Sequence, residues 1–332
     1  MSIRSARDLL VSVIVPVHNE EGNVALLARR VSEAVASTGA RIELVFVDDG
    51  SSDATVSRVL ELAGRDADVR LLPLSRNFGH QVALTAGLDA CRGDLAITMD
   101  GDLQHPPELL PTLVRCWEEG YDVVLTVRED SEDVSLMKAA TSSLFYRIIN
   151  ALSDVKMTPS ASDFRLLDRS CIDALCQLRE RDRFLRGLVS WIGYNQCMVP
   201  YQAAVRHSGR SKYTWRAMFR FAVAGLSSFS AVPLRFSLYL GLVMAAFSFL
   251  YALFVVLDYS FRLTGAQYVW GWTTIVCLVT MLSGIQLIML GIMGEYLFRL
   301  YQESKHRPIY LIKQNPLRLP LRLIHPEGVG RS

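Results

Sequence analysis

The sequence has no pair of cysteines at C-x-x-C spacing, although it contains six cysteines in 332 residues. One of them, Cys277, lies inside a long apolar stretch. This pattern argues against a zinc site and against a disulfide framework, and it predicts reduced thiols that face the cytosol. The formal net charge is only +2, so the overall charge gives no argument for nucleic-acid binding.

A secretory signal is also missing from the amino terminus. The apolar run from Leu9 to Val17 is short, contains Pro16 and ends in a His-Asn-Glu triplet instead of the small residues of a cleavage site. We therefore expect the amino-terminal domain to stay in the cytosol.

Charged residues are nearly absent between positions 236 and 298, where the acids and strong bases are Asp258, Arg262 and Glu295. Two stretches within this part, Leu238 to Leu257 and Trp270 to Gly294, carry no charge over 20 and 25 residues. At about 1.5 Å per residue, each could cross ~30 Å of hydrocarbon as a helix. The sequence therefore predicts two transmembrane helices.

Acidic residues are absent from Ala203 to Arg235, whereas this segment has six bases: Arg206, Arg210, Lys212, Arg216, Arg220 and Arg235. Such a run beside an apolar span favours anionic headgroups, and its aromatic part, 213–221, suits a helix in the membrane interface. An ordinary packed helix with a basic face is the alternative. The positive-inside rule then places both ends of the spans in the cytosol. The predicted parts are a catalytic domain, a basic loop with an interfacial helix, two spans and a cytosolic basic tail, at 1–205, 206–235, 236–298 and 299–332.

Apolar runs alternate with helical patterns along the first two hundred residues. The predicted strands are Val11–Val17, Ile42–Val47, Val69–Leu74, Leu95–Met99, Tyr121–Val127 and Asp163–Leu167. The predicted helices are 24–35, 56–63, 77–90 with Asn77 as its cap, one starting at Pro106 and Pro107, 131–150 and 169–178. This alternation predicts an α/β domain of three layers with a mostly parallel sheet.

Acidic residues follow two of the predicted strands, where ligands of such sheets bind. Asp100 and Asp102, with Gln104 as a third oxygen ligand, suit a hard cation such as Mg²⁺ or Mn²⁺ that would neutralise a leaving diphosphate. Asp49 could accept hydrogen bonds from a nucleoside. Taken alone, each acid has a simpler explanation as turn, cap or solvent-facing chemistry.

Several motifs together make the chain recognisable. They are Val15-Pro16-Val17-His18-Asn19-Glu20, Val47-Asp48-Asp49-Gly50-Ser51-Ser52-Asp53, Met99-Asp100-Gly101-Asp102-Leu103-Gln104-His105-Pro106-Pro107-Glu108, Ser162-Asp163-Phe164-Arg165, Arg206-x-x-Gly209-x-Ser211-Lys212-Tyr213, Gly294-Glu295-Tyr296, Arg299-x-Tyr301 and Arg307-Pro308. The first three resemble family 2 glycosyltransferases of the GT-A, Rossmann-like fold. The later ones resemble the polyprenyl-phosphate branch, and in particular the bactoprenol glucosyltransferases, so that the resemblance covers residues 11 to about 312.

The resemblance implies roles for the matching positions. Asp49, with Pro16 and Glu20, would hold the nucleoside of the nucleotide-sugar, with Asp100 beside its diphosphate. The residues implied to grip phosphates are Arg128, Arg206, Ser211 and Lys212. Asp163 would be the catalytic carboxylate, together with Asp102 at the metal. Because a phosphate monoester is largely dianionic at neutral pH, Asp163 would mainly position the acceptor.

The resulting hypothesis is an inverting enzyme of the inner membrane that moves a hexose, with glucose favoured, from a UDP-sugar to undecaprenyl phosphate. A dolichol-phosphate-mannose-synthase-like enzyme that uses GDP-mannose is an alternative, and a scaffold with a relict transferase domain is another. The scaffold is disfavoured because both acids of the acidic triplet, which is Asp100-Gly101-Asp102, are intact. A processive polysaccharide synthase is disfavoured because the Q-x-x-R-W motif is missing. The oligomeric state, including a homo-oligomer, is left open.

Overall fold

The computed structural model describes residues 4–129, 161–181, 183–202 and 271–314, with isolated positions between 239 and 261. The strands are β1 (Leu10–Val17), β2 (Arg41–Asp48), β3 (Val69–Pro73), β4 (Leu95–Thr98), β5 (Val123–Glu129), β6 (Ala161–Asp168) and β7 (Gln196–Gln202). The helices are α1 (Val24–Ala36), α2 (Thr55–Ala63), α3 (His80–Ala90), the short 3-10 helix η1 (Pro107–Leu109), α4 (Leu110–Glu118), α6 (Arg169–Gln177), α7 (Leu185–Trp191) and α10 (Gly271–Ser304).

The strands form one sheet in the order β3-β2-β1-β4-β6-β5-β7. β1 pairs in parallel with both β2 and β4, and β5 pairs in parallel with β7. Only β6, among the described strands, runs antiparallel to its neighbours β4 and β5. The predicted mostly parallel α/β sheet is therefore confirmed, and it fits the GT-A, Rossmann-like class.

Two hydrophobic cores lie on opposite faces of the sheet. Side chains of α1, α2 and α4 pack with Val11, Val13 and Val15 of β1 on one face. Side chains of α3, α6 and α7 pack with Ile14 on the other face. Because successive side chains of a strand point to opposite faces, the uninterrupted apolar run of β1 supplies both cores.

The start of α3 differs from the sequence-based prediction. The helix begins at His80 and is preceded by Gly79, whose φ is 100°. The prediction that Asn77 caps this helix is therefore wrong. A glycine can adopt this left-handed backbone without the strain that a side chain brings. The turn into the helix therefore lies at Gly79, two residues after the predicted cap Asn77.

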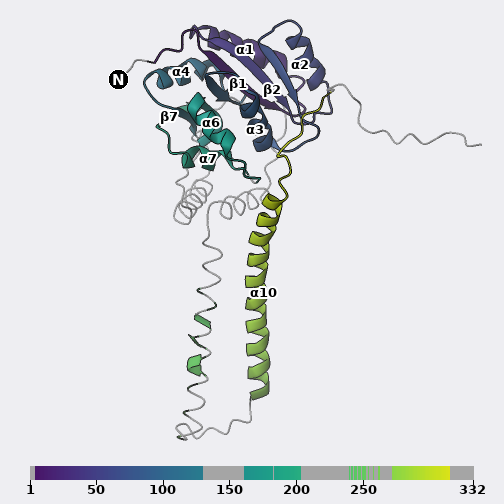
Figure 1. The fold of residues 1–332 in the computed structure, drawn as a ribbon, viewed down its shortest axis with the longest axis vertical. Coiled ribbons are helices and arrows are strands. Elements are labelled where there is room, and N and C mark those ends of the chain that lie inside the picture. Colours follow the sequence, from purple (N-terminus) through teal and green to yellow (C-terminus); the bar gives the residue numbers. More distant parts are fainter. Residues whose placement is uncertain are drawn as a thin grey trace, which may run out of the picture.

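The apolar helix α10 extends away from the α/β domain (Figure 1). Its segment Met281–Ser304 has a mean hydropathy of 1.5, and none of its residues is buried. It is the one described helix that is long and apolar enough to cross a membrane. The helix continues past Gly294, where the charge-free stretch of the sequence ends, and Arg299 forms an ion pair with Glu295 at 3.4 Å within it.

The first predicted span, 238–257, lies largely outside the described residues. Its described positions are helical, and apolar side chains among them, such as Phe247 and Phe249, are exposed. Two transmembrane helices therefore stay a prediction. The predicted helix 131–150 and the basic segment 206–235 also lie outside the described residues.

The segment after α10 returns to the sheet and pairs with its β3 edge. Ile312 forms an antiparallel bridge with Leu74. The amide of Ser75 donates to the carbonyl of Leu311 at 2.8 Å, and the amide of Lys313 donates to the carbonyl of Pro73 at 2.8 Å. The end of α10 is thereby tied to the α/β domain.

Candidate active site

The predicted acids meet at one edge of the sheet, beside the end of β1. Asp49 follows β2 and Asp100 follows β4, and these two strands flank β1. Gly101 lies against β1 so closely that an added Cβ would be 3.0 Å from Cγ1 of Val17 and 3.2 Å from the carbonyl of Pro16. The Asp100-Gly101-Asp102 turn and the Asp49 turn therefore border the same strand end.

Asp49 is buried and its carboxylate binds backbone amides. Its Oδ1 accepts from the amide of Phe78 at 2.7 Å, and its Oδ2 accepts from the amide of Gly79 at 3.0 Å. Burial raises the pKa of Asp49, and the two amide hydrogen bonds oppose that rise. The carboxylate thus fixes the loop before α3, and contact with a nucleoside stays a prediction for this residue.

The other predicted nucleoside residues lie beside the same turn. Pro16 belongs to β1 and pairs in register with Val47 of β2. The amide of Glu20 donates to the hydroxyl of Thr55 at 2.8 Å, and its carboxylate accepts from Asn23 at 2.6 Å. Glu20 therefore orders the start of α1 and joins it to the start of α2.

A buried histidine fixes the acidic triplet. Nδ1 of His105 accepts from the amide of Asp100 at 2.9 Å, so its neutral ring carries the hydrogen on Nε2, which lies 2.9 Å from the hydroxyl of Ser162. Burial lowers the pKa of His105, which favours this neutral form. The ring also stacks on Phe164 at a centroid distance of 5.1 Å. His105 therefore packs in the core and orients the Asp100 turn.

The triplet has the chemistry of a partial cation site. Oδ1 of Asp100 is buried and makes no hydrogen bond among the described residues, although Nε2 of His80 lies 3.3 Å from it, and Oδ1 of Asp102 accepts from the amide of Gln104 at 3.1 Å. No group of three or more His, Cys, Asp or Glu side chains among the described residues is arranged to hold a metal ion. Mg²⁺ commonly takes one or two carboxylates and completes its shell with substrate phosphates and water. The residues present fit that arrangement.

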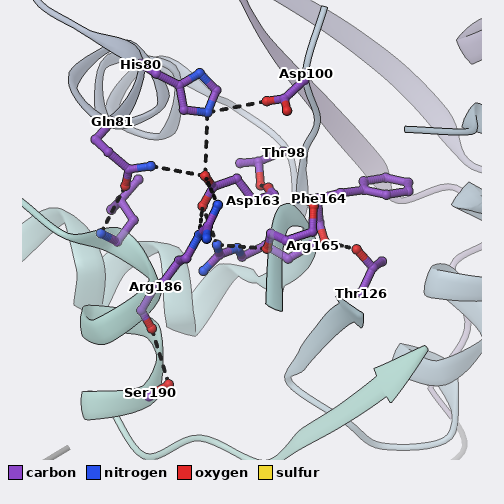
Figure 2. A network of polar contacts seen from close by, with 12 residues as sticks. His80, Gln81, Thr98, Asp100, Thr126, Asp163, Phe164, Arg165, Arg186 and Ser190 are labelled. Atoms are coloured by element: carbon purple, nitrogen blue, oxygen red, sulfur yellow. Dashed lines mark hydrogen bonds and ion pairs between the residues drawn. The ribbon is translucent and has the colours of Figure 1, made fainter. Parts of the chain in front are cut away.

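Asp163, on β6, is the centre of a polar network (Figure 2). Its Oδ1 accepts from Arg165 at 2.6 Å, and Arg186 reaches both carboxylate oxygens, with Nε at 3.1 Å and Nη2 at 2.9 Å. Gln81 donates to Oδ2 at 3.1 Å. Burial alone would raise the pKa of Asp163, but His80 and the two guanidinium groups hold it well below its usual range. Such a carboxylate stays ionised and is a weak base.

His80 connects the network to the acidic triplet. Its Nε2 lies 3.3 Å from Oδ1 of Asp100 and 3.7 Å from Oδ2 of Asp163 (Figure 2). Burial disfavours the charged imidazolium, yet the two carboxylates outweigh burial and raise the pKa of His80. His80, Gln81 and Arg186 were missed from the sequence. The sequence pointed to His80 and Gln81 only through their position at the start of a helix that follows the Gly79 turn. It gave no comparable sign for Arg186.

The predicted phosphate-binding residues are only partly described. Arg128 is exposed on β5 and pairs in register with Tyr201 of β7. Burial raises the pKa of Tyr201, and the charges of Arg128, Asp100 and Arg186 also act on this hydroxyl. These three charged side chains therefore lie around Tyr201. Arg206, Ser211 and Lys212 lie outside the described residues.

An open α/β sheet with acids at the ends of two parallel strands that flank a third is typical of enzymes that bind nucleotide ligands. Comparison with known families makes this class specific. The family described as Glycosyl transferase family 2 matches residues 12–175. With relatives of 37–39% identity over more than nine tenths of its length, the chain belongs to this family of glycosyltransferases.

Three relatives illustrate the likeness. The bactoprenol glucosyl transferase of Shigella phage SfV is 39% identical over 91% of this chain and 98% of its own length. The prophage bactoprenol glucosyl transferase homolog of Escherichia coli (strain K12) is 38% identical over 92% of this chain and 98% of its own. The uncharacterized glycosyltransferase YkcC of Bacillus subtilis (strain 168) is 37% identical over 93% of this chain and 95% of its own.

Proposed function

We propose that the chain is an inverting glycosyltransferase that moves one hexose, with glucose preferred, from a UDP-sugar to undecaprenyl phosphate at the cytosolic membrane face. The observation that carries the proposal is the 39% identity to a bactoprenol glucosyl transferase across 98% of that protein, which includes both the acid cluster and the apolar helix. The product would be a lipid-linked sugar for later export and for modification of a glycan or O-antigen.

The donor would lie along the strand ends that carry the acids. Asp49, Pro16 and Glu20 border the place for the nucleoside, and Asp100, Asp102 and Gln104 would hold Mg²⁺ or Mn²⁺. When bound, such an ion would offset the negative charge of the leaving diphosphate. The buried oxygen of Asp100, which makes no hydrogen bond within the described residues and has only His80 at ion-pair distance, supports this assignment.

The transfer itself needs little proton chemistry. An acceptor phosphate, whose second pKa is about 6, is mostly dianionic at neutral pH and can attack the anomeric carbon directly. A bond forms from a phosphate oxygen to that carbon while the bond to the diphosphate breaks on the opposite face, which inverts the configuration. The lowered pKa of Asp163 supports a positioning role for this residue.

Positive charge beside the acids would hold the phosphates together. The side chain of Arg186 is 31% exposed, and it contacts Asp163 in the polar network beside the acids. We assign Arg186 and Arg128 to phosphate contacts, with Arg206, Ser211 and Lys212 of the basic segment gripping the acceptor. Arginine suits this task because its planar group binds two oxygens at once.

The membrane arrangement is part of the same proposal. α10 and the 238–257 segment would cross the inner membrane, with the catalytic domain and both termini in the cytosol. The exposed apolar surface of α10 and the return of its carboxyl end to β3 support this arrangement.

The test is a donor panel with purified full-length protein. Labelled UDP-glucose, UDP-galactose, UDP-N-acetylglucosamine and GDP-mannose would be incubated with a polyprenyl phosphate, with Mn²⁺, with Mg²⁺ or with EDTA. We expect lipid-extractable label from UDP-glucose and a loss of that label in EDTA. Preference for GDP-mannose would favour the mannose-synthase alternative, and absence of product with every donor would favour the scaffold.

Matched variants would separate donor chemistry from acceptor binding. Asp102→Asn should abolish turnover, whereas Asp68→Asn, an equal change at an exposed site, should not. Lys212→Ala should mainly raise KM for the acceptor. If Asp102→Asn and Lys212→Ala both affected only donor binding, the assignment of the basic segment would be wrong.

A further inference from the structure

A cleft away from the acids lies where the last turn of α10 meets the catalytic domain. Its volume is about 500 Å³. One wall comes from the catalytic domain, with Asp89, Arg179 and Arg181, and the other comes from the end of α10 and the following segment, with Glu303, His306 and Arg307. The Arg307-Pro308 motif, which the reaction does not use, is part of this cleft.

The two walls are held together by hydrogen bonds. The amide of Arg181 donates to Oε1 of Glu303 at 2.7 Å. On the other side, Oδ2 of Asp89 accepts from the hydroxyl of Tyr310 at 2.9 Å and from Arg179 at 2.7 Å. Pairing of the next residues with β3 then fixes the segment in place.

The charged side chains that line the cleft are three arginines and two acids, which leaves an excess of positive charge. Glu303 is bound by a backbone amide, and Asp89 is bound by Arg179 and Tyr310. Within the described part of the chain, no carboxylate lies within ion-pair distance of Arg181 or Arg307. An anion that entered the cleft would therefore meet two guanidinium groups and His306.

Arg183, a buried arginine whose charge acts on residues that line the cleft, adds to this charge. Nε and Nη1 of Arg183 are buried without a hydrogen-bond partner among the described residues, and its charge interacts with those of Asp89 and Arg179. Unsatisfied buried donors are costly, so the positive charge of Arg183 favours an anion in the adjoining cleft.

The helix beside the cleft presents apolar side chains up to its rim. Leu297, Leu300 and Tyr301 are 67%, 66% and 57% exposed. A ligand with an anionic headgroup and acyl chains would satisfy both surfaces, whereas a free anion would use only the cleft.

The cleft is separate from the active site. Asp89 lies at the end of α3 and His80 at its start. Nine residues of helix span about 14 Å, so a headgroup at Asp89 would not occupy the place of the acceptor phosphate at the strand ends.

We propose that this cleft binds the phosphate headgroup of an anionic bilayer phospholipid. The proposal rests on the membrane placement of α10 that is part of the proposed function. A bound headgroup would bridge the catalytic domain to the end of α10 and fix the depth at which the acids face the membrane.

The test uses the full chain in phosphatidylcholine nanodiscs that contain a trace of photoactivatable phosphatidylglycerol or photoactivatable phosphatidylcholine. We expect labelling of residues 302–310 by phosphatidylglycerol in clear excess over phosphatidylcholine. Arg181→Gln with Arg307→Gln should reduce that labelling about twentyfold, since each basic residue near an anionic lipid contributes a few-fold to binding. Arg58→Gln with Arg65→Gln, an equal loss of charge at exposed positions, should leave it unchanged.

Competition identifies the source of the phosphate. Equal labelling by both lipids, or unchanged labelling in the double variant, would overturn the proposal. Displacement of the label by millimolar inorganic phosphate would indicate a free-anion site, and displacement by a trace of polyprenyl phosphate would indicate an acceptor site; either result contradicts a phospholipid site. Sugar transfer measured in the same nanodiscs separates failure of this proposal from failure of the proposed function.

Discussion

Arg186 of α7 contacts both carboxylate oxygens of Asp163, at 3.1 Å from Nε to Oδ1 and at 2.9 Å from Nη2 to Oδ2. This pair joins a helix to the antiparallel strand in the middle of the sheet. If Arg186 stabilises charge on the transferred or leaving phosphates, Arg186→Gln should lower kcat by about 10²- to 10³-fold, the usual loss for a charge-stabilising donor. Steady-state transfer with UDP-glucose measures this loss.

Arg186→Lys keeps the charge but not the two-point geometry, so its activity should lie between those of the wild type and Arg186→Gln. Arg169→Gln is the matched control, because Arg169 forms an exposed ion pair with Asp173 on α6. Equal activity of Arg186→Gln and this control would remove Arg186 from the reaction.

Asp163 should stabilise the fold as well as orient Arg186. Asp163→Asn would leave the buried guanidinium of Arg165 without its charge partner and should cost about 3–5 kcal/mol in the free energy of unfolding. The pKa of Asp163 is lower in the fold than its ordinary value of 3.8. Its contribution is therefore present above about pH 3.8 and is lost as pH falls through the folded pKa.

Urea midpoints of wild type and Asp163→Asn between pH 7 and pH 3 measure this contribution. The difference should be full at pH 7 and should shrink below about pH 4. A difference that stayed constant over that range would contradict the ionised, ion-paired state of Asp163.

Gly50 should be required at the turn that follows Asp49. Its φ is 72°, and an added Cβ would lie 2.7 Å from the backbone of Arg76 and Asn77. Gly50→Ala should therefore destabilise the protein by about 1–3 kcal/mol and raise KM for the donor, because the displaced loop carries the amides that hold Asp49.

Gly22→Ala gives the comparison for Gly50, since nothing lies within 4 Å of a Cβ built there. Its stability should change by no more than about 0.5 kcal/mol. Thermal unfolding of both variants measures the two effects. An equally mild effect at position 50 would argue against the close approach of its Cβ to the backbone of Arg76 and Asn77.

The sequence predicted the parts of the site that are local. Asp49 and Asp100 each follow an apolar strand, and the helical pattern between strands made a mostly parallel sheet the simplest arrangement. Their meeting at one sheet edge then follows from topology alone.

The parts of the fold and site that the sequence did not predict depend on contacts between residues far apart in the chain. β6 inserts antiparallel between β4 and β5, and no local pattern specifies that place. Arg186 meets Asp163 across 23 positions, and Ile312 reaches Leu74 across most of the chain. β7 was not predicted, because a clear alternation of buried and exposed residues is found only at the end of this outer strand.

The segment after α10 should protect the β3 edge from solvent. The amides of Ser75 and Lys313 are both bonded across this edge, so their hydrogen exchange should be slow. Removal of residues 309–332 should speed exchange at Ser75 while leaving the amide of Asp49, which donates to Val17 at 2.9 Å, protected. Fast exchange at Ser75 in the intact chain would contradict the pairing.

Transfer of a hexose to a lipid phosphate is tested most directly by mass analysis of the lipid product that the full-length protein makes from UDP-glucose. With polyprenyl phosphate as acceptor, we expect a product that carries one hexose on the phosphate. With the matching polyprenol, which has the same chain but no phosphate, we expect none. Transfer to polyprenol, or no glycolipid from polyprenyl phosphate, would contradict the proposed function.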